Sequence, residues 1–420
     1  MAYLLIHDGF LMRTLVVGAG ITGLSIAENL RREGVKVILI DRSLPGDPNQ
    51  ASFGNAGILA RSAIVPVSQP GIIKKIPKML INKNSPLFMR WPYLPKLLPW
   101  LVPFLRNGAG ARYSKIVAAL DSLTNDSVDQ HLRLASGTGA EKYIRVGDIG
   151  YIYPDEDSFL ADSVMRETKS NYGYHYKKLM RNQLVDLDPF ISNRYNIATV
   201  YNNHGWITSP PKYLEAIFDH YISSGGEFAQ DEVIDILDGE VVLKNSENLK
   251  ADKVILAMGA WSGSLAKKLG IETKLESERG YHIFFKGSNR SPPFPLMVSD
   301  GKFFITPMED GVRCAGVIEF GGLNAPPSKK PLELIRSRIR ECYDDLQFEE
   351  ETVWMGHRPS TPDSLPLVGR VQGKPNLIFA FGSQHIGLTI GPKIGVLISQ
   401  LLTGKRMNFN LTPFAPNRFN

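Results

Sequence analysis

The sequence contains very little cysteine: only Cys314 and Cys342 occur among its 420 residues. Two thiols exclude a disulfide framework and a thiolate metal cluster, and they fit a reducing compartment. We therefore expect a cytoplasmic protein that holds no metal.

Long apolar runs and one-sided charge are also absent. No stretch reaches the roughly 18 to 20 apolar residues that a transmembrane helix needs, so the sequence predicts no membrane span. Lys and Arg number 48 against 42 Asp and Glu, a net charge of +6. This modest, diffuse excess argues against a nucleic-acid partner and favours an acidic ligand or an anionic surface.

The composition is that of an ordinary globular enzyme. The chain is 43% hydrophobic and 21% charged, which excludes a disordered, collagen-like or coiled-coil protein. At 420 residues a single hydrophobic core stops growing, so we expect two domains.

A glycine-rich turn follows the first apolar strand. Residues 14–17 are β-rich, Gly18 to Gly23 read Gly-Ala-Gly-Ile-Thr-Gly, and apolar residues at helical spacing then lead to Gly34. Residues 35–40 predict a second buried strand that ends at Asp41. This order predicts a parallel βαβ unit with a right-handed crossover, as in dinucleotide-binding sites.

Each conspicuous residue of this unit has a separate role. Gly18 permits the tight turn, Gly20 lets a pyrophosphate approach the backbone, and Gly23 lets the helix pack against the strand. The helix N-terminus then offers free N–H groups and a positive dipole end to the phosphates. Asp41 can accept hydrogen bonds from ribose hydroxyls.

Segments typical of the same sheet return later in the chain. Residues 253–262 predict a buried strand that runs into a glycine turn, and residues 376–402 predict a strand, a glycine-rich turn and an apolar helix. Residues 281–285, 303–307 and 312–318 instead predict antiparallel strands. We expect an α/β protein, α+β overall, in which a Rossmann-type dinucleotide-binding domain is interleaved with an antiparallel-sheet substrate domain. The expected boundaries are 12–85, 205–270 and 350–420 for the first domain, and 86–204 and 271–349 for the second.

Proline and aromatic residues are concentrated between residues 85 and 106. The prolines recur every three or four positions, which argues against a long straight helix: they are Pro92, Pro95, Pro99 and Pro103. Aromatic and basic residues across 74–106 suit an apolar surface that contacts an anionic membrane: they include Trp91, Tyr93, Trp100, Phe104, Lys74, Lys75, Lys78, Arg90, Lys96 and Arg106. A kinked pair of helices packed on the substrate domain explains the pattern equally well.

Several motifs together carry a resemblance to a known family. They are Gly18 to Gly23 with Asp41-Arg42, Ser52 to Gly57, Glu278-Arg279-Gly280-Tyr281-His282, Thr306-Pro307-Met308, Gly356 to Pro366, and Phe381-Gly382 through His385 to Pro392. With them, the sequence from residue 12 onward resembles the FAD-dependent oxidoreductases of the D-amino-acid oxidase superfamily, most closely bacterial D-amino-acid dehydrogenases. The segments that begin at Glu278 and Gly356 are similar to the D-hydroxyproline dehydrogenase subgroup, which indicates a cyclic or secondary amino acid.

The resemblance implies that the dinucleotide is FAD, held without a covalent bond. Relatives with covalent flavin carry a cysteine near the C-terminal motif, whereas no cysteine follows Cys342 here. Residues 382–389 would aim the N-terminus of the last helix at the flavin ring, where negative charge accumulates on reduction. The implied cofactor contacts are Gly18, Ala19, Gly20, Ile21, Thr22, Gly23, Asp41, Arg42, Ser52, Asn55, Ala56, Gly57, Val233, Gly259, Trp261, Gly382, His385, Gly387, Leu388 and Thr389.

The resemblance also implies a small amino-acid substrate. Arg358 is the best candidate for binding its carboxylate through two charge-assisted hydrogen bonds; the alternative role is a structural ion pair. Tyr281 could add a hydroxyl, and His282 and His385 could lie near the amine or the flavin edge, although each could equally be a satisfied core group. The implied reaction is oxidative deamination or dehydrogenation of a small D-amino or cyclic, proline- or hydroxyproline-like amino acid, with hydride transfer from Cα to flavin N5.

The electron acceptor and the assembly state stay open at this point. A quinone or another carrier would suit a dehydrogenase placed peripherally on the inner face of the cytoplasmic membrane, and the alternative is an oxygen-using amino-acid or sarcosine-type secondary-amine oxidase or demethylase. A non-catalytic FAD-binding subunit of a hetero-oligomer is an alternative of another class, and either a homo- or a hetero-oligomer fits. A nicotinamide-dependent dehydrogenase would share Gly18 to Gly23 and Asp41 but leaves the C-terminal loop unexplained.

Overall fold

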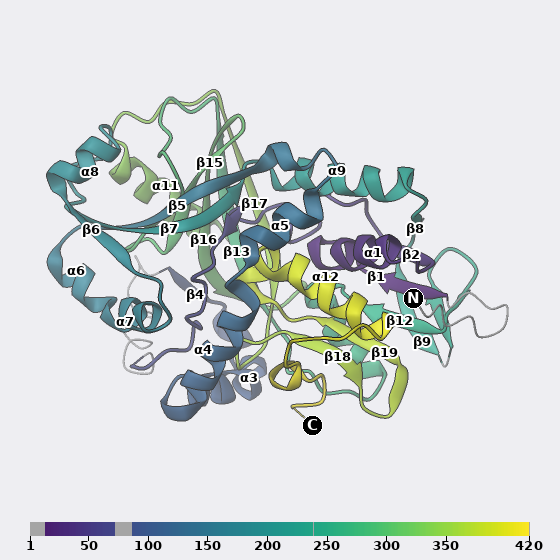
Figure 1. The fold of residues 1–420 in the computed structure, drawn as a ribbon. Coiled ribbons are helices and arrows are strands. Elements are labelled where there is room, and N and C mark those ends of the chain that lie inside the picture. The colour runs from purple at the N-terminus through teal and green to yellow at the C-terminus, as the bar shows by residue number, and fades with distance from the viewer. Residues whose placement is uncertain (1–12, 72–85, 238, 420) are drawn as a thin grey trace.

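A computed structural model describes residues 13–71, 86–237 and 239–419 of the chain. The described strands form a six-stranded sheet, a ten-stranded sheet and a small three-stranded sheet. The two larger sheets occupy neighbouring parts of the molecule, with helices over their faces (Figure 1). The helices are α1 (Ile21–Arg32), α3 (Leu94–Asn107), α4 (Gly110–Thr124), α5 (Ser127–Ala135), α6 (Glu156–Ala161), α7 (Ser163–Asn171), α8 (Arg181–Leu187), α9 (Pro210–Ser223), α10 (Ser262–Lys268), α11 (Lys329–Cys342) and α12 (Gly387–Thr403).

The six-stranded sheet is built from buried apolar strands. Its order is β18 (Leu367–Val371), β19 (Lys374–Phe381), β12 (Lys253–Leu256), β1 (Thr14–Val17), β2 (Val37–Asp41) and β8 (Glu227–Gln230). All neighbours are parallel except the edge pair β18 and β19. Every residue of β1 is buried, as expected for a parallel sheet covered on both faces. The predicted Rossmann-type sheet, assembled from the beginning, middle and end of the chain, is confirmed.

The ten-stranded sheet is mostly antiparallel. Its order is β17 (Glu350–Ser360), β13 (Glu276–Lys286), β16 (Gly311–Phe320), β15 (Phe303–Met308), β14 (Leu296–Val298), β5 (Ile144–Tyr153), β7 (Ile197–Ile207) and β3 (Ile58–Leu59), with β4 (Leu87–Met89) beside β16 and β6 (Tyr176–Met180) beside β7. Two pairings, β14 with β5 and β16 with β4, are parallel. The small antiparallel sheet consists of β9 (Val233–Leu237), β10 (Glu240–Leu243) and β11 (Leu249–Lys250).

The chain passes between the two larger sheets several times, which is the predicted interleaving. Strands β3 and β17 lie within stretches that the expected boundaries assign to the cofactor-binding domain, yet both hydrogen-bond to strands of the ten-stranded sheet. The domain boundaries themselves stay a prediction.

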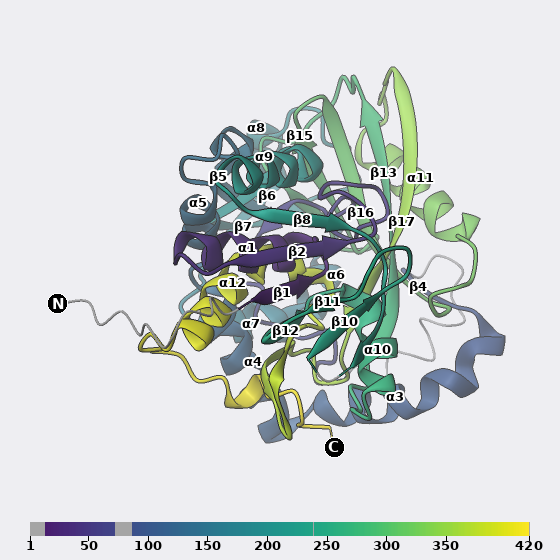
Figure 2. The same ribbon diagram turned by 90° about the vertical axis from the view of Figure 1, so that its right-hand side faces the viewer.

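The proline-rich segment contains a regular helix. α3 includes Pro99 and Pro103, and its buried residues Leu97, Trp100 and Phe104 lie at helical spacing. The two prolines each remove one backbone donor, and burial of this apolar face compensates for the loss. The outcome is one helix packed on the protein rather than a kinked pair, and Figure 2 shows it along the rim of the molecule. Lys74, Lys75 and Lys78 lie outside the described residues.

The last helix is apolar because it belongs to the core. By length and composition the stretch Gln384–Thr403 could cross a membrane, yet 61% of its most apolar window is buried inside the protein. It packs along α1, and the two helices lie side by side in Figures 1 and 2. Gly395 makes this approach close, because a Cβ on it would lie only 2.8 Å from the backbone of Ser25 in α1.

We predict that Gly395→Ala destabilises the protein by about 1 to 2 kcal/mol. Alanine gains helix propensity, but its methyl group must push α12 away from α1, and overpacking costs about 1 to 3 kcal/mol. Thermal unfolding at saturating FAD measures the change. Gln400→Ala, half-buried on the same helix, is the control and should leave the midpoint within a degree or two; an unchanged midpoint in Gly395→Ala would contradict the close packing.

Candidate active site

A cavity of about 840 Å³ is lined by residues of both larger sheets. This size is typical of cofactor and small-molecule sites. Its wall brings together segments that are far apart in the sequence, including the glycine-rich turn, the loop after β2, the end of β12, strand β17 and the beginning of α12.

The glycine-rich turn cannot hold side chains at two of its positions. Gly18 has φ +106°, and a Cβ there would lie 2.4 Å from the Ala257 carbonyl oxygen. A Cβ on Gly23 would lie 1.7 Å from the Gly18 carbonyl oxygen. Gly18, Gly20, Ile21 and Thr22 line the cavity, whereas Ala19 and Gly23 lie behind them.

Asp41 lies at the carboxyl end of β2 and lines the cavity. Its carboxylate accepts hydrogen bonds from the backbone N–H groups of Ala19 (2.6 Å) and Ser43 (3.1 Å). Burial raises the pKa of Asp41, and these N–H groups act against that rise. The next residue, Arg42, stacks over the Trp261 ring at 4.5 Å, and both line the cavity with Val233 and Gly259.

The loop after β2 is held from two directions. Ser52 Oγ accepts a hydrogen bond from the Ile21 backbone N–H at 3.0 Å, which ties the loop to the first turn of α1. Arg313 of β16 donates to the carbonyl oxygens of Phe53 (3.0 Å) and Asn55 (2.7 Å). Ser52, Asn55 and Ala56 line the cavity, and Gly57, with φ +80°, does not. The pattern of the sequence had given Arg313 no role.

The C-terminal loop lines the cavity along its whole length, from Gly382 to Thr389. It leads into the N-terminus of α12, whose unpaired N–H groups and dipole favour negative charge nearby. The Thr389 hydroxyl donates to the Ile58 carbonyl oxygen at 2.9 Å, which fixes the helix against β3.

Arg358 of β17 lines the cavity with its guanidinium partly free. It donates to the carbonyl oxygens of Val317 (2.9 Å) and Gly316 (3.1 Å). These bonds use two of the five N–H donors of a guanidinium, so three remain for a ligand. Burial lowers the pKa of Arg358, and Glu278 opposes this shift.

The other three residues predicted for catalysis are placed differently. Tyr281 lines the cavity, but its hydroxyl donates to Glu319 at 2.5 Å and accepts from the Ser328 N–H at 3.0 Å. His282 is outside the cavity wall, where its Nδ1 lies 3.0 Å from the Gly54 carbonyl oxygen and its ring stacks on Trp354. His385 lines the cavity with an accessible ring, and the loss of solvation at the cavity wall, together with the Arg358 charge, lowers its pKa to about 4.

Two further ionisable residues line the cavity without a sequence signal of their own. Glu278 belongs to the motif Glu278-Arg279-Gly280-Tyr281-His282, which contributes to the family resemblance, but the sequence alone predicts no role for this glutamate. Lys169 of α7 is 2% exposed and donates to the Tyr151 hydroxyl at 2.8 Å, while burial lowers its pKa to about 7. It occurs in a polar helix whose pattern does not distinguish it from a surface lysine.

A family model described as "FAD dependent oxidoreductase" (DAO) matches residues 13–401. The chain belongs to this family. It is therefore a flavoenzyme with FAD as cofactor, and the nicotinamide alternative is excluded.

Relatives of this FAD-dependent oxidoreductase cover nearly the whole chain. It is 33% identical over 413 residues to a protein named D-amino-acid oxidase from Bradyrhizobium diazoefficiens, covering 96% of this chain and 98% of the relative. It is 27% identical over 397 residues to a D-amino acid dehydrogenase from Helicobacter pylori, covering 92% of this chain and 94% of that one.

Solved structures share the fold at lower identity. L-proline dehydrogenase from P. horikoshii superposes with a TM-score of 0.71 at 16% identity, covering 97% of each chain. Glycine oxidase from Bacillus cereus ATCC 14579 gives a TM-score of 0.69 at 18% identity, covering 94% of this chain and 96% of that one.

The residues of the cavity fit FAD. The glycine-rich turn brings bare backbone to the wall, Asp41 stands at the end of β2, and the N-terminus of α12 borders the same space. Neither Cys314 nor Cys342 lines the cavity, so no thiol there is placed to attach the flavin. When bound, FAD supplies the electron-accepting ring; the chain supplies the surface that orients it.

We predict that Lys169 makes the stability of the protein rise with pH above neutrality. Because its pKa is lowered in the folded protein, the unfolded chain binds more protons between about pH 7 and pH 10, and raising the pH favours folding by up to about 1.4 kcal/mol per unit. Thermal midpoints at pH 7, 8 and 9, compared between wild type and Lys169→Met, measure this contribution. The variant should show a flatter profile, and parallel profiles would contradict the shifted pKa.

Proposed function

We propose that this chain oxidises a small D-amino acid, or a cyclic amino acid of the proline or hydroxyproline type, at its Cα–N bond. In this reaction a hydride leaves Cα for flavin N5, and water hydrolyses the resulting imine. The observation that carries the proposal is Arg358, a partly buried guanidinium with unused donors on the wall of the cofactor cavity. The names of the relatives, D-amino-acid oxidase and D-amino acid dehydrogenase, support the same class of substrate.

The roles of the chain's own residues follow from this proposal. Arg358 binds the substrate carboxylate through a bidentate, charge-assisted pair and so fixes Cα relative to the flavin. The loop 382–389 and the N-terminus of α12 stabilise negative charge at the cofactor. Tyr281 forms part of the cavity wall, and its hydroxyl is already paired with Glu319 and the Ser328 N–H.

Arg358→Met should lower kcat/KM for amino-acid substrates by at least about 30-fold. Losing one partner of a desolvated charge pair costs about 2 to 5 kcal/mol, whereas the flavin contacts lie elsewhere. The substrate is first found by screening D- and L-proline, D-hydroxyproline, D-alanine and sarcosine with an artificial electron acceptor, and flavin content is read from the visible absorbance. Arg370→Met, on the exposed face of β18, is the control. Unchanged kinetics in Arg358→Met would remove Arg358 from the site, and no turnover of any compound would refute the proposed substrate class.

We further propose that α3 places the enzyme on an anionic membrane, where it passes electrons to a quinone. The outer side of the segment exposes apolar residues: Trp91 is 59% exposed, Leu98 47% and Val102 44%. Lys96 and Arg106 are exposed on the same helix. Exposed apolar side chains beside cations are typical of interfacial helices. The second candidate is an oxygen-using oxidase, favoured by the name of the relative that is 33% identical.

Reoxidation of the reduced enzyme separates these two acceptors. In stopped-flow experiments, we expect reoxidation to be fastest with quinone held in anionic lipid vesicles and slow with dissolved oxygen. The double variant Leu98→Ser, Val102→Ser changes exposed residues of α3 that do not line the cavity, and it should lose the reaction with vesicles and keep the reaction with a soluble quinone. Leu237→Ser, which changes an exposed leucine on β9, is the control. Fast reoxidation by oxygen alone would favour the oxidase, and an unaffected double variant would contradict membrane docking.

A further inference from the structure

We propose that Glu278 and Arg358 together recognise the zwitterionic form of the substrate, and that the Glu278 carboxylate accepts the proton that the substrate ammonium must lose. This inference rests on the proposed amino-acid substrate and adds a residue to its chemistry. Three observations support it: Glu278 lies opposite Arg358, one of its oxygens has no hydrogen-bond partner, and the neighbouring buried carboxylates are already hydrogen-bonded or ion-paired.

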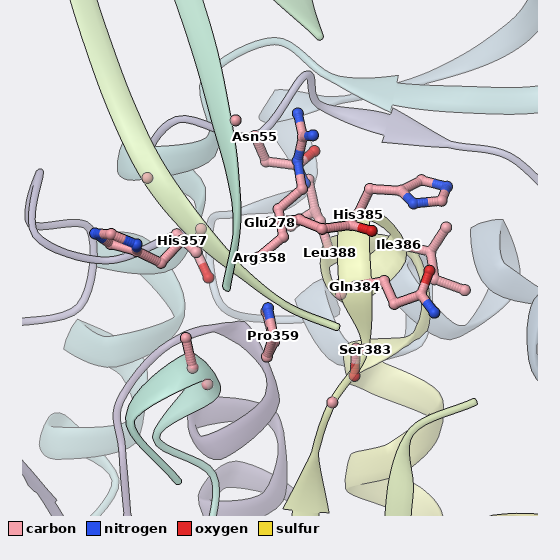
Figure 3. Close-up of a pocket in the computed structure, with 18 of the residues that line it drawn as sticks. Asn55, Glu278, His357, Arg358, Pro359, Ser383, Gln384, His385, Ile386 and Leu388 are labelled. Carbon is pink, nitrogen blue, oxygen red and sulfur yellow. The ribbon is translucent and has the colours of Figure 1, made fainter. Parts of the chain in front are cut away.

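Strand register places the two residues together. Glu278 of β13 lies directly opposite Arg358 of β17 in the antiparallel pairing, and both line the cavity. Gly280, two residues along β13, leaves room for the arginine side chain, since a Cβ there would lie 2.4 Å from its Nη2. Figure 3 shows Glu278 and Arg358 on neighbouring strands, with His385 at the beginning of α12 beside them.

Glu278 is a buried carboxyl with an unused acceptor. It is 2% exposed, and its Oε2 has no hydrogen-bond partner. The buried carboxyls nearby are satisfied: Glu276 accepts from Tyr93 and the Ser277 N–H, and Glu319 pairs with Arg279 at 2.8 Å. An unmade hydrogen bond at a buried charged group is costly, so its persistence at a cavity wall indicates that a ligand completes it.

Opposite charges side by side match the two ends of an α-amino acid. Arg358 offers three N–H groups to the carboxylate, and Glu278 offers an oxygen to the ammonium. A carboxylic acid without nitrogen meets only the arginine, and a simple amine meets only the glutamate. The pair therefore selects molecules that carry both groups on one carbon.

Hydride loss from Cα requires the nitrogen lone pair, so the ammonium must first give up a proton. In this step an N–H bond breaks, an O–H bond forms on Glu278, and the electron pair stays on nitrogen. Burial raises the pKa of Glu278, the Arg358 charge and the neighbouring Ser360 hydroxyl lower it, and the Glu276 charge raises it further. A carboxylate with a raised pKa is a better proton acceptor near neutral pH.

The other titratable groups around this point are less suited to the task. His385 and His357 each have a pKa lowered to about 4, chiefly by loss of solvation at the cavity wall and then by neighbouring arginine charges, so they hold a proton poorly. The Tyr281 hydroxyl is engaged with Glu319 on β16. Lys169 lies on α7, where its Nζ donates to Tyr151. Glu278 is the group that combines negative charge, a free oxygen and a place beside Arg358.

The test compares Glu278→Gln with Glu276→Gln, a change of a buried glutamate on the same strand that does not line the cavity. At pH 7 we expect Glu278→Gln to lower kcat/KM by about 100-fold. The deficit should shrink as pH rises, because more substrate then arrives with a neutral amine. Glu276→Gln should keep the shape of the wild-type pH profile, shifted to slightly lower pH because the Glu276 charge raises the pKa of Glu278. A loss in Glu278→Gln that is equal at every pH would overturn the proposal.

Ligand binding supplies a readout that does not depend on turnover. The probe is the carboxylic acid that lacks only the amino group of the best substrate, followed by its effect on the flavin absorbance. Glu278→Gln should bind this acid as tightly as wild type or more tightly, because a negative charge beside Arg358 has gone. Weaker binding of the acid in this variant would mean that Glu278 merely supports Arg358, which would overturn the proposal.

A second variant and the activity of the wild-type enzyme distinguish a failure of this inference from a failure of the proposed function. If Glu278→Gln loses FAD, Glu278→Asp takes its place: it keeps a carboxylate and should retain the wild-type pH profile at a reduced rate, and a profile that rises with pH would count against a proton acceptor here. Failure of the proposed function itself appears differently, as a wild-type enzyme that oxidises none of the amino acids tested.

Discussion

The structure depends on how closely its backbone segments approach one another around the first βαβ unit. Gly18 and Gly23 bring the turn against β12 and against itself, and Gly395 brings α12 against α1. A methyl group at any of these positions would separate elements whose contact forms the cavity. The shape of the cofactor site therefore depends on glycines that lack a side chain as well as on the side chains that line the cavity. A substitution at these glycines would affect backbone packing and cofactor binding together.

Much of this arrangement could be predicted from local patterns. The glycine spacing, the two apolar strands and Asp41 define a dinucleotide site because each acts within a short stretch of chain, and the structure places Gly18, Gly20, Asp41 and the loop 382–389 in the lining of one cavity. Periodicity also located the antiparallel strands β13, β15 and β16. The local sequence argues against the single helix α3 because proline breaks helices, and the burial of Trp100 and Phe104 that stabilises it is visible only in the folded protein.

What escaped prediction depends on contacts between distant segments. Glu278 acquires its significance only from the register of β13 with β17, eighty residues away in sequence. Lys169 becomes a wall residue only because α7 places it against Tyr151 of β5 and Tyr201 of β7. Conversely, His282 looks like a catalytic histidine in sequence, yet it packs on Trp354 behind the loop that contains Gly54. The residue type indicates which chemistry a side chain could support. Its hydrogen-bond and packing partners in the fold determine whether the side chain is available for that chemistry.

The discontinuity of the parallel sheet has a consequence for how the protein is made. Strand β1 is synthesised first, yet its neighbour β12 comes from the middle of the chain and its covering helices include α12, near the end. On the ribosome, the glycine-rich turn therefore exists long before the surfaces that enclose it. Until α12 emerges, the apolar face of α1 lacks its cover, and transiently exposed apolar surface of this kind favours aggregation. Tight FAD binding becomes available only to a chain whose last helix has been made.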